Sequence, residues 1–179
     1  MILIQKGKRE DYIKAWNYMY KQNKNAYNKD PLYIDINPSL NKIPLKTEIN
    51  NFCTIAYDTE VKTDEFVYGK PVGIFSFVVT NSKTIGKQFV VAPDYSRKGI
   101  GKALLLVNMK TLVDNNIFKF YIGCSKCSSG ILKSFGYKPY NEDSEHDMYK
   151  YNIEIKDDEN VNFDNLYKEY VKNNENIIV

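Results

Sequence analysis

The stretch Phe89–Leu106, FVVAPDYSRKGIGKALLL, decides the fold and carries the strongest functional signal in the chain. It begins with apolar residues typical of a buried strand, passes through a polar loop, and runs through Gly99 and Gly101 into an apolar helix. The first N–H groups of a helix have no intrahelical partner, and together with the helix dipole they attract anions. Because glycine has no Cβ, a diphosphate can approach the main chain closely. The stretch therefore predicts a site for a phosphorylated cofactor.

Two well-known phosphate loops do not fit this spacing. A Walker loop requires two glycines separated by four residues and then Lys-Ser/Thr, but here Lys102 is followed by Ala103. A dinucleotide fingerprint requires a third glycine three residues after the second, and that position is Leu104. A glycine-containing turn in an ordinary α/β domain, without a ligand, is the alternative that a short motif leaves open.

The remaining pattern resembles the acyl-coenzyme A signature of the GNAT N-acetyltransferase family. In that signature a strand ends in Val-x-Pro and a polar loop with Gly-x-Gly leads into an apolar helix, and Val91–Pro93, Gly99 and Gly101 match it. The family's loop usually starts with Gln or Arg at the position aligned here with Ser96, whereas Arg97 lies one place later.

The chain downstream follows the family's order as well. Residues 119–123 predict a strand parallel to the preceding one, and residues 126–135 predict a helix that Gly136 ends. Tyr137, which we expect to enter the next strand, takes the place of the Phe that the family usually carries after this glycine. The other expected strands are residues 2–4, 51–57, 71–80, 84–91 and 147–155, and the other expected helices lie near residues 12–19 and 100–115.

The resemblance implies an α/β (α+β) fold with a GNAT-like mixed, mostly antiparallel sheet of six to seven strands flanked by helices. We expect one domain over residues 1–155 and a C-terminal extension over residues 156–179. In the extension, apolar and aromatic residues recur at helical spacing from Phe163 to Val171, after a capping residue at Asn162 or Asp164. This helix packs on its own domain, docks on another subunit or covers the acceptor cleft.

The resemblance also implies acetyl-coenzyme A as cosubstrate, with no metal. The sheet of the family opens between the strands that correspond to residues 84–91 and 119–123, and the pantetheine arm lies in the gap. Main-chain groups of the first strand and Ser125 hold the arm, N–H groups of residues 97–103 hold the diphosphate, and residues 23–50 line the acceptor site. The cofactor-binding residues implied are Phe89, Val90, Val91, Ser96, Arg97, Lys98, Gly99, Ile100, Gly101, Lys102, Ala103 and Ser125.

The acid and the base that the family often uses are missing from this sequence. The family's proton donor, a Tyr four residues before the helix-ending glycine, is replaced by Leu132, and the strand before the phosphate loop offers Lys87 and Gln88 instead of a carboxylate. His146, the single histidine, and Tyr137 are the candidate substitutes. Alternatively, water carries the proton and the site works by holding the reactants together.

Cys124-Ser125-Lys126-Cys127 opens a helix after a strand, as the redox motif of thioredoxins does. No Trp-Cys-Gly-Pro pattern surrounds it, so a thiol redox protein ranks third, behind an N-acetyltransferase and an acyl-coenzyme A-binding module with little turnover. A structural zinc site needs four ligands, and Cys53 and His146 would have to converge from far away.

Composition and charge agree with a globular, cofactor-binding protein. The 179 residues are 43% hydrophobic and 26% charged, which fits one domain with a sizeable core. The net charge of +3 is positive because the chain before residue 141 is strongly basic, whereas residues 141–179 are acidic. A basic body suits an anionic cofactor.

No secretory signal, membrane-spanning run or nucleic-acid-binding motif is visible in the sequence. We therefore expect a cytoplasmic monomer or homodimer without nucleic-acid or membrane partners. From the resemblance, its acceptor is an amine of a small molecule, amino acid or peptide.

Overall fold

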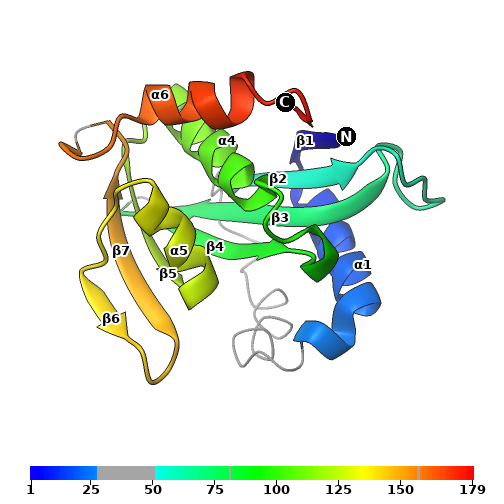
Figure 1. Ribbon diagram of the computed structural model, residues 1–179, viewed down its shortest axis with the longest axis horizontal. Coiled ribbons are helices and arrows are strands. Elements are labelled where there is room, and N and C mark those ends of the chain that lie inside the picture. The colour runs from blue at the N-terminus through cyan, green and yellow to red at the C-terminus, as the bar shows by residue number, and fades with distance from the viewer. Residues whose placement is uncertain (28–50, 81, 157) are drawn as a thin grey trace.

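The computed structural model describes residues 1–27, 51–80, 82–156 and 158–179, which form one open sheet with helices packed against it (Figure 1). The strand order is β6-β7-β5-β4-β3-β2-β1-β8. The strands are β1 (Ile2–Gly7), β2 (Asn51–Asp58), β3 (Lys70–Val79), β4 (Thr84–Val91), β5 (Lys119–Cys124), β6 (Asn141–Asp143), β7 (Met148–Glu154) and β8 (Ile177–Ile178). The helices are α1 (Arg9–Tyr27), α4 (Ile100–Asp114), α5 (Lys126–Ser134) and α6 (Phe163–Tyr167), with a 3₁₀ turn η1 (Pro93–Tyr95) and a π-helical turn η2 (Lys168–Lys172).

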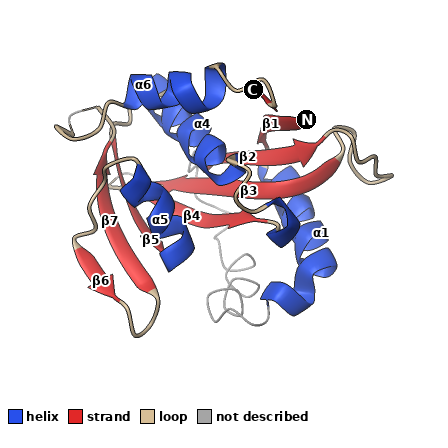
Figure 2. Cartoon of the chain, in the orientation of Figure 1, coloured by secondary structure: helices blue, strands red, loops and turns tan. Residues whose placement is uncertain are grey.

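Two hydrophobic cores hold the helices to the sheet. On one face, α4, α5 and α6 cover a core that contains Leu104, Phe120 and Tyr151 (Figure 2). On the other, α1 buries Trp16 and Met19 in a second core. Because α4 is apolar on nearly every side, most of its residues are buried, and each fully buried Leu stabilises the fold by roughly 2 kcal/mol. This burial fixes the position of the N-terminus of α4 against the sheet.

The sheet opens beside the end of β4. Strand β5 pairs with β4 in parallel only at Ile85–Tyr121 and Gly86–Ile122. The pairing of β3 with β4 shifts register between Ile74 and Ser76, where β4 carries one extra residue. A β-bulge of this kind bends its strand, and the ends of β4 and β5 part beyond it. The expected opening between these two strands is thus present.

The fold class is confirmed: the sheet is mixed and mostly antiparallel, and helices flank it. The number of strands differs, because the described residues form eight strands rather than six to seven. The additional strands are very short. Strand β8 has two residues and pairs in parallel with β1, and β6 has three residues and pairs with β7.

The prediction that Tyr137 enters a strand was wrong. Its N–H donates to the carbonyl of Leu132, and the N–H of Gly136, whose φ is 103°, donates to Lys133. These two bonds close α5 in a Schellman motif, so the backbone of Tyr137 belongs to the helix end. The chain first bonds to β7 at Tyr140.

The C-terminal segment packs on the same core as α4. Phe163 and Val171 are buried in it, and the side chain of Asn162 accepts a hydrogen bond from the N–H of Asn165, 3.0 Å away. Asn162 is therefore the cap of the expected helix, which continues from α6 into η2.

The division of the chain at residue 155 stays a prediction. Most of the region expected to line the acceptor site, residues 28–50, lies outside the described residues.

Candidate functional site

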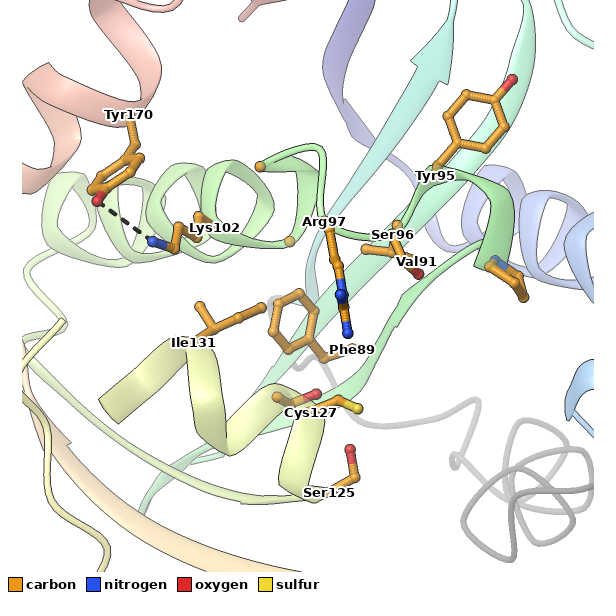
Figure 3. A pocket seen from close by; sticks show the side chains of 14 residues that line it. Phe89, Val91, Tyr95, Ser96, Arg97, Lys102, Ser125, Cys127, Ile131 and Tyr170 are labelled. Atoms are coloured by element: carbon orange, nitrogen blue, oxygen red, sulfur yellow. Dashed lines mark hydrogen bonds between the residues drawn. The ribbon is translucent and has the colours of Figure 1, made fainter. Parts of the chain in front are cut away.

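A cavity of about 700 Å³ lies where the sheet opens, between the end of β4, the N-terminus of α4 and the start of α5 (Figure 3). Its size falls within the range of small-molecule sites. Its walls combine apolar side chains with a few basic and hydroxyl groups. The lining residues are Phe89, Val91, Pro93, Tyr95, Ser96, Arg97, Gly99, Gly101, Lys102, Ser125, Cys127, Ser128, Ile131 and Tyr170.

The N-terminus of α4 is open to an anion. The first α-helical bond runs from the N–H of Ala103 to the carbonyl of Gly99, so the N–H groups of Ile100, Gly101 and Lys102 precede it. Within the described part of the chain no side chain caps this end, and the first turn of α4 holds no acidic residue. Gly99 has φ = 79°, and a Cβ there would meet nothing within 4 Å. The geometry leaves the positive end of the helix dipole uncompensated at the cavity.

Gly101 lines the cavity for a reason that the sequence pattern did not predict. It is buried, and a Cβ built on it would lie 2.8 Å from Cδ1 of Ile131 on α5. The absence of a side chain therefore lets α4 and α5 approach each other. Only Gly99 has the open surroundings expected of both glycines.

Arg97 brings a positive charge into the cavity. Its backbone has φ = 62°, which is uncommon for a residue other than glycine, and its side chain extends over the cavity in Figure 3. Such backbone conformations gather at ligand sites, where the surrounding structure holds them. Although Arg97 lies one place later than the usual family position, its guanidinium lines the same cavity as Gly99.

Four residues of the predicted set do not line the cavity. The Lys98 ammonium lies 4.8 Å from the centroid of the Tyr95 ring, and Lys98 is not among the residues that line the cavity. Val90 is buried in the core beneath α1, and Ile100 and Ala103 are buried in the core beneath α4. Their side chains serve packing, so any contact with a ligand at these positions falls to the main chain.

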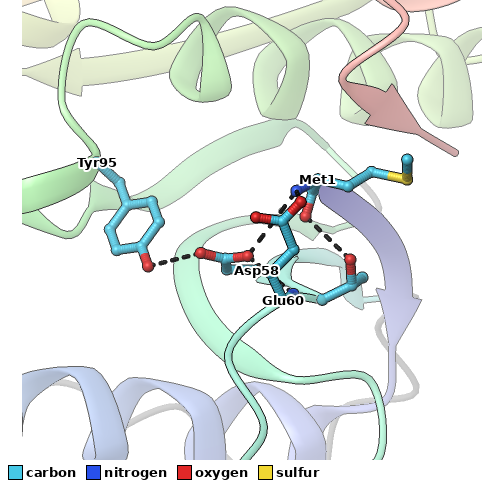
Figure 4. Close-up of polar contacts among 5 residues, drawn as sticks. Met1, Asp58, Glu60 and Tyr95 are labelled. Atoms are coloured by element: carbon cyan, nitrogen blue, oxygen red, sulfur yellow. Dashed lines mark hydrogen bonds and ion pairs between the residues drawn. The ribbon is translucent and has the colours of Figure 1, made fainter.

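Tyr95 is a lining residue that the sequence analysis missed. Its hydroxyl donates to Oδ2 of Asp58, 2.7 Å away at the end of β2 (Figure 4). Partial burial and the Asp58 carboxylate raise the pKa of Tyr95 to about 12, so this hydrogen bond persists at neutral pH. The N-terminal ammonium of Met1 lies 4.0 Å from the other Asp58 oxygen and 3.0 Å from Glu60. These contacts connect the loop that contains Tyr95 to the end of β2 and to the residue before β1.

Helix α5 supplies the opposite wall. Ser125 is its N-cap, and Ser128 and Ile131 follow at intervals of three residues on the same side, next to Cys127. Ser125 was expected here, whereas the others were not assigned. Their helical spacing from Ser125 is a signal that could have found them.

The two candidate catalytic residues lie away from the cavity. His146 is exposed in the turn between β6 and β7, where its Nδ1 lies 2.8 Å from Asp143. Tyr137 is buried, its hydroxyl has no hydrogen-bond partner among the residues that the structure describes, and burial raises its pKa. Leu132 is buried in the core. Of the described residues that line the cavity, none is a carboxylate or a histidine.

The cysteine pair does not have the character of a redox site. Cys124 is buried at the end of β5, and burial raises its pKa to about 12, which disfavours the reactive thiolate. Cys127 is exposed and lines the cavity. Among residues 1–27, 51–80, 82–156 and 158–179, no cluster of His, Cys, Asp and Glu could hold a metal ion, and no helix is long and apolar enough to cross a membrane.

No sequence-defined family and no curated protein matches the chain. Solved structures do match it in fold. An acetyltransferase from Streptococcus agalactiae superposes with a TM-score of 0.59 at 16% identity, over 86% of this chain and 98% of that one. Escherichia coli ElaA gives 0.58 at 13% identity, over 86% and 100%. A GNAT-family acetyltransferase from Staphylococcus aureus gives 0.56 at 18% identity, over 85% and 99%.

These likenesses extend over most of the sheet and its helices. Because the sequence identities are no higher than 18%, these matches show a shared fold and nothing more. With its opened mixed sheet and the N-terminus of α4 beside the opening, the chain has the GNAT N-acetyltransferase fold.

Proposed function

We propose that the protein is an acyl-coenzyme A-dependent N-acetyltransferase that moves an acetyl group from acetyl-coenzyme A to an amine. The observation that carries this proposal is the cavity, which joins the uncapped N-terminus of α4 to the opening between β4 and β5. The first feature suits a diphosphate and the second an extended arm. The fold shared with solved acetyltransferases supports the same reading.

The residues present fit the nucleotide part of coenzyme A. The N–H groups at the start of α4 and the Arg97 guanidinium bind the diphosphate, because main-chain donors and a planar cation both suit phosphate oxygens. The apolar side chains of Phe89, Val91 and Ile131 flank the pantetheine arm, and Ser125 hydrogen-bonds to it. The main chain of β4 next to the opening has lost its neighbour β5 and offers its own N–H and C=O groups to the arm.

Catalysis at this site rests on positioning. In this proposal water removes the proton from the acceptor amine, and the composition of the described cavity wall, which includes no carboxylate and no histidine, is consistent with it. Holding the amine and the thioester in reacting geometry can lower the barrier by several kcal/mol. We propose that the acceptor is an amine of a small molecule, amino acid or peptide. We also propose that the protein is cytoplasmic and acts as a monomer or a homodimer.

The test is to incubate the purified protein with acetyl-coenzyme A and a panel of amines while free thiol is measured. We expect thiol release that depends on one class of amine and acetylated product of matching mass. The Gly99→Asp variant, whose carboxylate repels the diphosphate, serves as the control for uncatalysed hydrolysis. If wild-type protein neither binds coenzyme A in calorimetry nor releases thiol, the proposal is wrong.

The second candidate function is an acyl-coenzyme A-binding module with little turnover. The replacement of the family's tyrosine by the buried Leu132, and the lack of acidic groups in the described cavity wall, favour it. Coenzyme A binding without turnover of any amine would select this function. The raised pKa of Cys124 argues against the thiol redox hypothesis.

A further inference from the structure

The cavity extends from the start of α4 to the Lys102 ammonium and to an aromatic ring that the loop pattern does not predict. Lys102 on α4 and Tyr170 in η2 line this end (Figure 3). In that view Lys102 and Tyr170 lie to the left of Arg97, and Ser125 and Cys127 lie below it. A ligand held at Arg97 and the start of α4 therefore has room to extend in two directions.

Lys102 is held by aromatic rings rather than by a carboxylate of the described residues. Its Nζ lies 3.4 Å from the Tyr170 hydroxyl, 4.5 Å from the centroid of the Tyr170 ring and 5.7 Å from that of Phe135. None of the ion pairs formed within the described residues includes Lys102. Aromatic rings orient an ammonium without neutralising it. Its charge is therefore available to an anion in the cavity.

Tyr170 is presented by an unusual piece of helix. The chain passes from α6 into the π-helical turn at Lys168–Lys172, and π-helical turns are frequent at functional sites. Within this turn Val171 is buried in the core, whereas Tyr170 is half-buried and lines the cavity. The Tyr170 ring packs against Phe135, with centroids 5.7 Å apart, which holds its position. The turn thus anchors itself through one residue and offers the next to a ligand.

We propose that Lys102 and Tyr170 form the subsite for the nucleoside end of coenzyme A. The Lys102 ammonium pairs with the 3′-phosphate, and the Tyr170 ring stacks on the adenine. This inference rests on the proposed function, because it assumes that the diphosphate lies at the start of α4 and the pantetheine arm runs toward Ser125. The C-terminal segment then determines specificity, because an acyl donor that contains pantetheine but lacks the nucleotide cannot contact Lys102 and Tyr170.

The test compares three ligands by calorimetry on the full chain: coenzyme A, 3′-dephospho-coenzyme A and 4′-phosphopantetheine. Wild-type protein binds coenzyme A at least about tenfold more tightly than the 3′-dephospho form, because a charge-assisted contact with the 3′-phosphate is lost. In Lys102→Met, which keeps an apolar stem against the two rings, this ratio falls to about one. The affinity for 4′-phosphopantetheine changes little.

Two substitutions on the C-terminal segment separate the ring from the hydroxyl. Tyr170→Leu weakens coenzyme A and its 3′-dephospho form alike by several-fold, because stacking is lost, while Tyr170→Phe keeps most of the affinity. Tyr167→Leu is the matched control: Tyr167 lies on the same segment, packs against Phe163 and does not line the cavity. It leaves all three affinities unchanged.

The outcomes distinguish this inference from the function beneath it. Equal wild-type affinities for coenzyme A and its 3′-dephospho form overturn the inference without any variant being needed. An unchanged ratio in Lys102→Met overturns it as well. If wild-type protein binds coenzyme A but Tyr170→Leu behaves like Tyr167→Leu, the ring has no role. A wild-type protein that binds none of the three ligands refutes the proposed function itself.

Discussion

Gly99 shows how a single residue serves the proposed diphosphate site. Its positive φ and the empty space around its Cα place main-chain donors, rather than a side chain, at the cavity. At Gly101, two residues later, the lack of a side chain allows α4 to pack closely against α5. The two glycines of this motif are therefore required for different physical reasons, and each needs its own experiment.

We predict that Gly99→Asp lowers the affinity for coenzyme A by at least roughly 100-fold relative to Gly99→Asn, since like charges about 4 Å apart repel by roughly 4 kcal/mol near a protein surface. Asn is the matched control because it has nearly the same size, carries no charge and tolerates a positive φ. Calorimetry measures the difference, and thermal unfolding verifies that both variants are folded. Equal affinities in the two variants would show that no phosphate lies beside Gly99.

The three cysteines differ in burial, and we expect their reactivity to differ for that reason. Burial raises the pKa of Cys53 to about 11 and that of Cys124 to about 12, so both thiols stay protonated until the pH approaches those values. Cys127 is exposed on the cavity wall. We predict that iodoacetamide at pH 8 modifies Cys127 alone, as peptide mass spectrometry will show, and that coenzyme A slows this modification.

The control for the alkylation experiment is Cys127→Ser, in which rapid modification disappears. Rapid modification of Cys124 would mean that the strand end opens in solution. Equal rates at Cys127 with and without saturating coenzyme A would place the ligand elsewhere.

At the scale of elements, the contact between α4 and α5 sets the width of the cavity. The two helices approach at Gly101 and Ile131, where any side chain on the first residue meets the tip of the second. This contact lies within the cavity wall, so the packing of two helices and the shape of the site are one feature. A change in either residue must affect both.

We predict that Gly101→Ala and Ile131→Val are coupled. The alanine Cβ overpacks against Cδ1 of Ile131, at a cost of roughly 1–3 kcal/mol that the better helix propensity of alanine offsets only in part. Ile131→Val removes this atom, so the double variant is more stable than the two single effects predict, by about 1 kcal/mol. Urea unfolding of the four proteins in the cycle measures the coupling. Strict additivity would contradict the close approach of α4 and α5.

At the scale of the whole molecule, the C-terminal segment joins parts of the chain that are remote in sequence. It buries Phe163 and Val171 in the core beneath α4, adds β8 beside β1, and brings Tyr170 to the cavity. Of the three roles open for this helix at the outset, the described residues show packing on its own domain. The stability of the sheet and the shape of the site therefore depend on the same segment.

We predict that Phe163→Ala lowers the free energy of unfolding by about 3–5 kcal/mol, because a large buried ring is replaced by a cavity. The weakened segment also holds Tyr170 less firmly, so coenzyme A affinity falls. Glu169→Ala, on the exposed side of the same segment, serves as the control and changes the stability by less than about 0.5 kcal/mol. Urea unfolding measures both. A loss below about 1 kcal/mol for Phe163→Ala would contradict its burial.

The sequence by itself determined the order of the main elements and the position of the glycine-containing loop before α4. Hydrophobic periodicity and the glycines at residues 99, 101 and 136 are local signals, and a strand, a loop and a helix start form from neighbouring residues. It also showed that Leu132 stands where the family often has a proton donor.

Only the tertiary structure decided which of these residues meet. In the folded chain the Lys98 ammonium lies against the Tyr95 ring, and Gly101 contacts Ile131 on α5. The N–H of Tyr137 forms one of the hydrogen bonds that end α5. The tertiary structure also brought Tyr170 to Lys102, which lies 68 residues earlier in the chain. These contacts depend on how helices and strands pack against one another. Packing brings together residues that are far apart in the sequence, and no local sequence pattern marks such pairs.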